Sequence, residues 1–330
     1  MSASFNHQPR PSRAAPDGHP IAGPIGASSS HSSRLVNGVP GHPGAANDGA
    51  HPGTTSVRRR VRTADLDVIR ERLSDRDWAV LRSVAEHQFL TGQQIADFHF
   101  HDHAETSGPR IARRVLARLR VLRILGALER RVGGIRAGSE GLIHYVDVVG
   151  DQLLRGRSGR TARRSREPSA RFVAHRLAVA DAHLALVRAH RDAAVELLDC
   201  VVEPASWRTY LGTGGARLIL KPDLFAETGA GEHLTHAWFI EVDLGSESIP
   251  TLLRKCRDYE AYRRTGIEQE QAGGFPLVVW SVVHRSEQKA IDRRAALEAA
   301  IASDRSLPPG LFRVIAPQQL TALLAGGGQL

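Results

Sequence analysis

The feature that most constrains the fold is a short segment, residues 108–123, in which arginines alternate with apolar residues at helical spacing. Its apolar residues recur every three to four positions and are Ile111, Val115, Leu119 and Leu122. The arginines on the remaining surface are Arg110, Arg113, Arg114, Arg118, Arg120 and Arg123. A helix with this pattern buries one face in a core and presents a cationic face outside. The segment therefore predicts a helix that can contact phosphates while it packs.

Two helix starts precede this segment. Ser74 with Asp77 and Thr91 with Gln94 each have the spacing of a capping box, in which two residues satisfy each other's backbone N–H groups. Two strand-like stretches follow the segment, residues 126–132 and 142–149, joined by a glycine-rich turn. Three helices followed by a basic hairpin predict a winged helix-turn-helix domain over residues 74–150.

Positive charge is concentrated in this part of the chain. Residues 58–171 hold 24 lysines and arginines against 14 aspartates and glutamates, whereas the whole chain has a formal net charge of +9. Such a local excess is typical of a module that binds a polyanion, and the motif makes double-stranded DNA the expected partner; a solvated basic surface is the alternative. Base and phosphate contacts are expected from the third helix and the hairpin, through Arg110, Arg113, Arg114, Arg118, Arg130, Arg131 and Arg136.

Composition divides the rest of the chain. Residues 1–57 are rich in Gly, Pro, Ser, Ala and His and predict a disordered tail, and residues 58–73 form a basic lead-in. Residues 151–171 predict a basic linker, and residues 172–330 a second domain. We find no apolar run near the roughly 20 residues that a membrane-spanning helix needs, so we expect a cytoplasmic protein with no membrane partner.

The second domain has the pattern of an α/β fold, which makes the whole chain α+β. A helix is predicted over about 169–192, followed by three strands. A further helix, a very apolar strand and a last helix come next. The three strands are predicted at 195–202, 217–225 and 236–244, and the later elements at 249–264, 275–283 and 288–302.

Three carboxylates stand out among these strands. Asp223 is predicted to end the second strand, after Pro222, while Glu241 and Asp243 lie on one face of the third. Clustered carboxylates repel one another unless a divalent cation lies between them, so Asp223, Glu241 and Asp243 are candidate Mg²⁺ ligands and catalytic residues. Alternatively, they cap strands or pair with nearby Lys and Arg.

The order of these elements, with Pro222-Asp223 and Glu241-Val242-Asp243, resembles the PD-(D/E)XK nuclease fold. More narrowly, the chain resembles the actinobacterial replication-relaxation family, which is associated with plasmid replication and mobile elements. The resemblance covers about residues 74–283. Its marks are the winged helix, His175-Arg176-Leu177, the segments KPDLF and FIEVDLGSES, and a helix that bears Lys255, Tyr259 and Tyr262.

One departure from the nuclease motif is informative, because Asp243 stands where the motif has lysine. Lys221 or Lys255 would then have to supply the ammonium group. The resemblance implies a DNA-binding accessory protein of plasmid or mobile-element replication or mobilisation, with replication or mobilisation proteins as further partners. An active Mg²⁺-dependent endonuclease and a transcriptional repressor are the alternatives.

Overall fold

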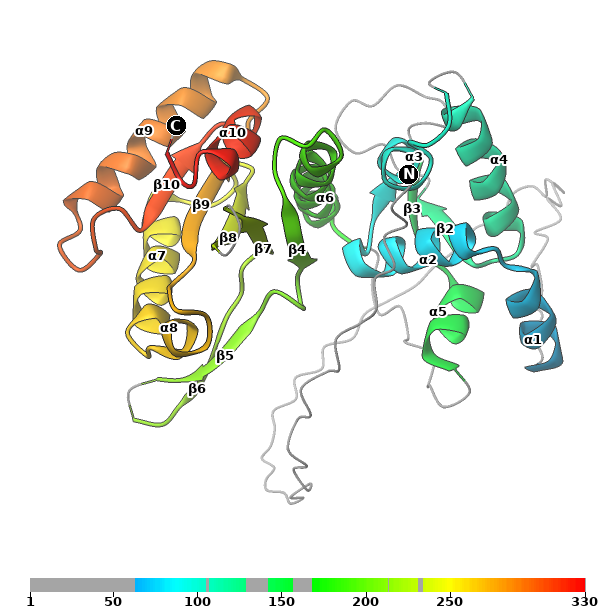
Figure 1. Ribbon diagram of the computed structural model, residues 1–330, viewed down its shortest axis with the longest axis horizontal. Coiled ribbons are helices and arrows are strands. Elements are labelled where there is room, and N and C mark those ends of the chain that lie inside the picture. The colour runs from blue at the N-terminus through cyan, green and yellow to red at the C-terminus, as the bar shows by residue number, and fades with distance from the viewer. Residues whose placement is uncertain are drawn as a thin grey trace, which may run out of the picture. The chain divides into compact units, whose positions relative to one another are not determined.

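Both predicted capping boxes begin helices in the computed structural model (Figure 1). The structure describes residues 63–104, 107–128, 142–156, 168–212, 214–230 and 234–329. The predicted tail, the hairpin turn with Arg130, Arg131 and Arg136, and residues 157–167 of the predicted linker lie outside this part. The described elements combine helices with a mixed sheet, so the chain is of the α+β class.

The helical half of the molecule comprises residues 63–156. Its sheet is antiparallel, with the strand order β1-β3-β2. The core of this half is made mainly by α2, α3 and α4. The elements are α1 (Thr63–Arg72), α2 (Asp75–His87), β1 (Leu90–Thr91), α3 (Gly92–His99), α4 (Gly108–Val121), β2 (Leu125–Leu128), β3 (Ile143–Val146) and α5 (Val148–Arg155).

Two helices of this half replace segments that the sequence analysis expected to be irregular or extended. Helix α1 lies within the predicted basic lead-in, and Leu66, Ile69 and Leu73 pack against the core at helical spacing. The second hairpin strand ends at Val146, and α5 follows, because Asp147 caps it through a hydrogen bond from the Val148 N–H.

The sheet half comprises residues 168–329, and its main sheet has the order β10-β9-β8-β7-β4. Strands β4, β7 and β8 are antiparallel neighbours, whereas β9 and β10 run parallel to β8. The elements are α6 (Ala170–Arg191), β4 (Leu197–Val202), β5 (Arg208–Leu211), β6 (Arg217–Leu220), β7 (Leu224–Gly229), β8 (Thr235–Asp243), α7 (Ile249–Arg263), α8 (Ile267–Ala272), β9 (Leu277–Val282), α9 (Glu287–Ser303), β10 (Phe312–Ile315) and α10 (Leu320–Ala325).

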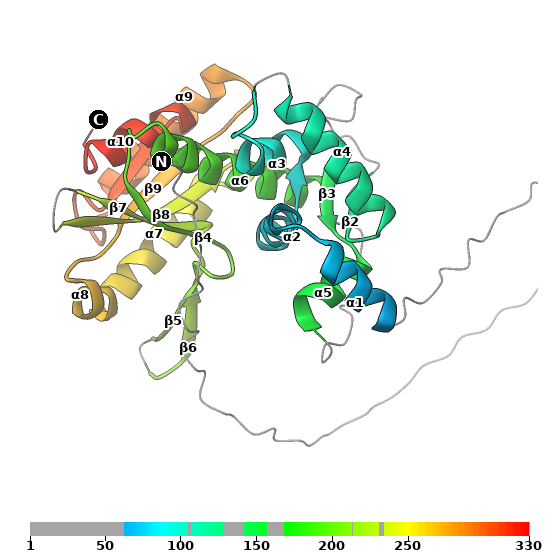
Figure 2. The same cartoon turned by 45° about the vertical axis from the view of Figure 1, so that its right-hand side comes forward.

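The predicted strand 217–225 is wrong as a single strand. Strand β6 pairs with β5 in a separate ribbon, visible in Figures 1 and 2, while β7 joins the main sheet. Pro222 lies between them and has no N–H for a ladder, so the chain changes sheets there. Asp223 consequently precedes a strand rather than ending one, and Lys221 does not share a strand face with it.

Helix α6 contributes to two cores. Ala180 and Leu184 belong to the core of the helical half, whereas Val179 and Leu186 pack, with α10, on one face of the main sheet. Helices α7 and α9 cover the other face. Residues 59–330 accordingly fall within one compact unit.

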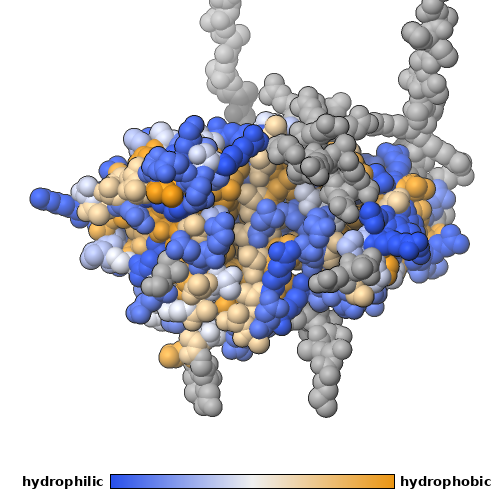
Figure 3. Space-filling view, turned by 90° about the horizontal axis from the view of Figure 1, so that it is seen from above, coloured by the Kyte–Doolittle hydropathy of each residue, from blue (hydrophilic) through white to orange (hydrophobic). Residues whose placement is uncertain are grey.

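The surface drawn in Figure 3 shows apolar residues in scattered patches among hydrophilic ones. Among the described residues, no helix is both long and apolar enough to cross a membrane.

Candidate functional site

A cleft of about 400 Å³ lies where β7 begins and β8 ends. All five residues that the sequence analysis selected as catalytic line it. They are Lys221, Asp223, Glu241, Asp243 and Lys255. The carboxylates come together because β7 and β8 are antiparallel, so that the start of one strand lies beside the end of the other.

Asp223 is fixed at the bottom of this cleft. Its Oδ2 accepts a hydrogen bond from the backbone N–H of Val242 at 2.8 Å, and Nε2 of His175 lies 3.2 Å from the same oxygen. Burial raises the pKa of Asp223, but the bond to His175 and the charge of Lys255 outweigh burial and leave the pKa below its usual value. For His175, burial disfavours the charged ring and lowers its pKa. The Asp223 carboxylate outweighs burial, so that the pKa of His175 is raised overall.

Glu203 is a neighbour of Asp223 that the sequence analysis did not find. Pairing of β4 with β7 places it there, and its N–H donates to the Asp223 carbonyl at 3.1 Å. The buried guanidinium of Arg176 donates to the Glu203 carboxylate. Arg176 also donates to the carbonyls of Glu86 and His87, at the end of α2, at 3.1 and 3.0 Å. One side chain of α6 therefore links the cleft to the helical half.

Glu241 is bound by two groups of α7. Lys255 Nζ lies 2.5 Å from its Oε2, and the Tyr259 hydroxyl donates to its Oε1. Burial raises the pKa of Glu241 to about 8, which the ammonium of Lys255 opposes. For Lys255, burial lowers the pKa, but Glu241 and Asp223 outweigh it and hold the ammonium charged. Tyr259 thus has a polar role in the site, whereas Tyr262 donates to Glu268.

Asp243 is held by a different cation. Arg293 of α9 donates to both of its carboxylate oxygens, and the Gly245 N–H donates to Oδ1 at 3.0 Å. A fork of two hydrogen bonds between guanidinium and carboxylate fixes both side chains. Asp243, which stands in place of the motif lysine, therefore holds the Arg293 guanidinium beside the cleft.

Three side chains at this cleft have donor atoms close enough together to share a metal ion. Donor atoms of His175, Glu203 and Asp223 all lie within 4.8 Å of one another. The carboxylates of the cleft also have partners of their own: Glu241 and Asp243, predicted as ligands with Asp223, are bound by Lys255, Tyr259 and Arg293, and Glu203 is bound by Arg176. A set of one imidazole and two carboxylates suits Mn²⁺ or Zn²⁺ better than Mg²⁺, which prefers oxygen ligands.

The lysines give a signal that the sequence analysis did not use. Only three of the 44 basic residues are lysines, Lys221, Lys255 and Lys289. Lys221 and Lys255 line the cleft, and Lys221 Nζ lies 4.8 Å from the centre of the Trp207 ring. Lysine is rare in this arginine-rich chain, and two of its three ammonium groups lie at this cleft.

The predicted DNA-binding arginines of the helical half lie on α4. Arg110, Arg113, Arg114 and Arg118 are exposed on the side opposite the buried Ala112, Leu116 and Leu119. Arg118 also pairs with the buried Asp77, whose side chain completes the capping box of α2, at 2.5 Å. Arg118 thus has a structural role in addition to its predicted one.

Comparison with curated proteins and with solved structures gives no match. Residues 81–278 match the model of one family, described as replication-relaxation. The match includes α3, α4, the shared helix α6, and Asp223, Glu241 and Lys255 of the cleft. Because the match spans more than half of the chain, the protein belongs to the replication-relaxation family.

Proposed function

We propose that this protein binds duplex DNA through residues 74–150 as an accessory factor of plasmid or mobile-element replication or mobilisation. The family fits a role in replication or mobilisation. The observation that carries DNA binding is the exposed row of arginines on α4, in a unit of three helices and a β1-β3-β2 sheet. That order of elements is the order of a winged helix, in which the third helix lies in the major groove.

The test of this proposal is the affinity for a labelled 30-base-pair duplex, measured by fluorescence anisotropy over a range of salt concentrations. Replacing Arg113 and Arg114 by Ala is expected to weaken binding about tenfold or more and to reduce the slope of log K against log salt by about 2, since each phosphate contact contributes about 0.9. The matched control replaces two exposed arginines of the sheet half, Arg254 and Arg305. Equal losses in both double variants would contradict the assignment of α4.

A second candidate function is metal-dependent cleavage of a phosphodiester. The observation that favours it is the contact between Lys255 and Glu241, because this ammonium comes from α7 to a cleft whose strand motif has Asp243 in place of lysine. His175, Glu203 and Asp223 would hold the ion, which would polarise a phosphodiester oxygen and activate water. Lys255 would neutralise charge that develops on the phosphate.

A plasmid-nicking assay with Mn²⁺, Zn²⁺ or Mg²⁺ separates the two candidates. An active enzyme should nick supercoiled DNA and lose this activity in Asp223→Asn and Lys255→Met, whereas Lys221→Met, a lysine at the rim of the same cleft, should retain more of it. If no nicking occurred with any of the three metals, the accessory role would be the one candidate function that remains.

A further inference from the structure

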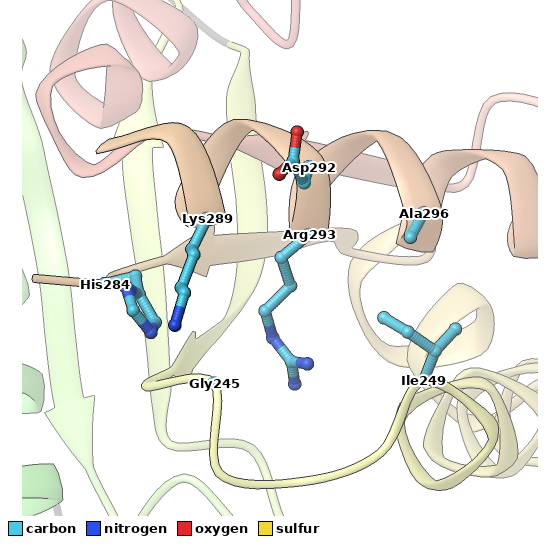
Figure 4. Close-up of a pocket in the computed structure, with 7 residues that line it drawn as sticks. All are labelled: Gly245, Ile249, His284, Lys289, Asp292, Arg293 and Ala296. Carbon is cyan, nitrogen blue, oxygen red and sulfur yellow. The ribbon is translucent and has the colours of Figure 1, made fainter. Parts of the chain in front are cut away.

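A second cavity, of about 320 Å³, lies beside the cleft, and its lining includes His284, Lys289 and Arg293. Figure 4 shows the nitrogen atoms of these three side chains directed into one space above the loop at Gly245, with the Asp292 carboxylate turned away. His284 follows β9, while Lys289 and Arg293 lie one turn apart on α9. Residues from two parts of the chain therefore contribute three hydrogen-bond donors to one cavity.

Each of these side chains is available as a donor. The Ser286 N–H donates to Nδ1 of His284 at 3.0 Å, so the neutral ring carries its proton on Nε2. Lys289 is exposed and forms no ion pair with any described residue. Arg293 uses Nε and Nη2 for Asp243 and for the Glu247 carbonyl, which leaves Nη1 without a partner among the described residues.

The floor of the cavity requires glycine. Gly245 has φ +73°, and a Cβ there would come within 3.1 Å of Cδ2 of His284 and 3.8 Å of Cδ of Arg293. Both the left-handed backbone and the close approach of the His284 ring disfavour a side chain at this position. The backbone is therefore shaped to keep the space below the three donors open.

The cavity and the carboxylate cleft border the same loop. Gly245 lines the cavity, whereas its neighbours Leu244 and Ser246 line the cleft. Arg293 joins them as well, because its partner Asp243 belongs to the cleft. Among the described residues, the lining contains no Phe, Tyr or Trp, and most of its polar groups are hydrogen-bond donors.

We propose that His284, Lys289 and Arg293 form a binding site for a backbone phosphate of the DNA strand that enters the carboxylate cleft. This proposal rests on the proposed binding of DNA and assigns it a second contact point, in the sheet half. A phosphate suits three donors of different geometry: the planar guanidinium, the compact ammonium and the imidazole N–H. Lys289 is also the third lysine of the chain, and it lies next to the cleft that contains the other two.

The experiment measures duplex affinity and its salt dependence for wild type, Lys289→Ala, and His284→Ala combined with Lys289→Ala. The double variant is expected to bind several-fold more weakly, with a slope lower by about 0.9 for the one phosphate lost. Lys289→Arg is expected to keep most of the affinity. Arg285→Ala is the matched control, because Arg285 is exposed next to His284 but does not line the cavity.

A second measurement does not depend on how well a variant folds. Acetylation of the full-length wild-type chain, followed by mass spectrometry, reports three lysine side chains, and DNA should slow the modification of Lys289. The phosphate site alone would be overturned if the wild type binds DNA, Lys289→Ala binds with the same affinity, and DNA does not protect Lys289 from acetylation. Absence of wild-type binding at low salt would overturn the proposed function and this site together.

Discussion

The helical half and the sheet half differ in where their functional candidates carry charge: on an exposed helix face in one, and in a buried cleft in the other. On α4, arginines such as Arg110 and Arg114 are exposed above an apolar core, and they form an extended cationic surface. In the sheet half, Asp223, Glu241 and Asp243 are buried, and each is held by a basic side chain. An exposed row of charge suits a long polyanion, whereas buried, paired charges suit chemistry at a single point.

Histidines differ according to their neighbours, since burial lowers the pKa of His183, on α6 of the sheet half, to about 3. Burial lowers the pKa of His87, His99 and His144, in the helical half, to about 4, so these rings are buried neutral. His175, beside Asp223, has a raised pKa instead. The difference is the nearby carboxylate, which stabilises the protonated ring more than burial destabilises it.

Among the single substitutions, the largest effect is expected from Arg176→Met. Arg176 is buried and links Glu203 to the end of α2, so its loss leaves a carboxylate and two carbonyls without their donor. We expect the free energy of unfolding to fall by about 3 to 5 kcal/mol. Urea unfolding measures this, with the exposed Arg171→Met on the same helix as control. Equal free energies of unfolding for the two variants would mean that the buried Arg176 contributes no more to stability than the exposed Arg171.

Acid is expected to destabilise the helical half through several histidines at once. Because the folded pKa of His87 and His144 is about 4 and the unfolded value about 6.5, the unfolded chain binds more protons between these values. Stability should therefore fall as the pH drops from about 6.5 to 4, by about 1.4 kcal/mol per pH unit for each such histidine.

His175 has the opposite sign. Its folded pKa is above the unfolded value, so its contribution is present at low pH and is lost as the pH rises through that folded pKa. NMR titration of the histidine rings checks both signs: His175 should titrate above His87 and His144. A common midpoint near 6.5 for all three would contradict the effect assigned to the Asp223 carboxylate.

The smallest effect is expected at the helix caps. Ser74→Ala breaks a reciprocal capping box with the buried Asp77, whereas Ser248→Ala, at the start of α7, removes exposed hydrogen bonds with the N–H and the hydroxyl of Thr251. Loss of a cap destabilises by about 1 kcal/mol, and Ser74→Ala should exceed Ser248→Ala. Thermal unfolding of both variants makes the comparison, and the reverse order would contradict it.

Local chemistry made much of the fold predictable. Ser74 with Asp77 and Thr91 with Gln94 begin helices because their hydrogen bonds depend only on residues three positions apart. The change of sheet at Pro222 was missed, because the apolar pattern runs on through residues 217–225 and only pairing with two different partners divides it.

Long-range pairing also explains what was missed in the site. Asp223, Glu241 and Lys255 were found from motif positions, and the structure brings them into one cleft. Glu203 has no such motif and reaches Asp223 only through the β4–β7 ladder. Lys289 of the proposed phosphate site had one signal, the rarity of lysine in an arginine-rich chain, whereas His284 is one of 16 histidines and had none.

The shared helix α6 has a consequence for the order of events during synthesis. The ribosome releases residues 63–156 first, yet their core also contains Ala180 and Leu184, and Gln94 donates to the Leu177 carbonyl. Until α6 emerges, the new helical half has an open apolar face and unmet polar groups. We therefore expect the helical half to complete its fold only after the first helix of the sheet half has been synthesised.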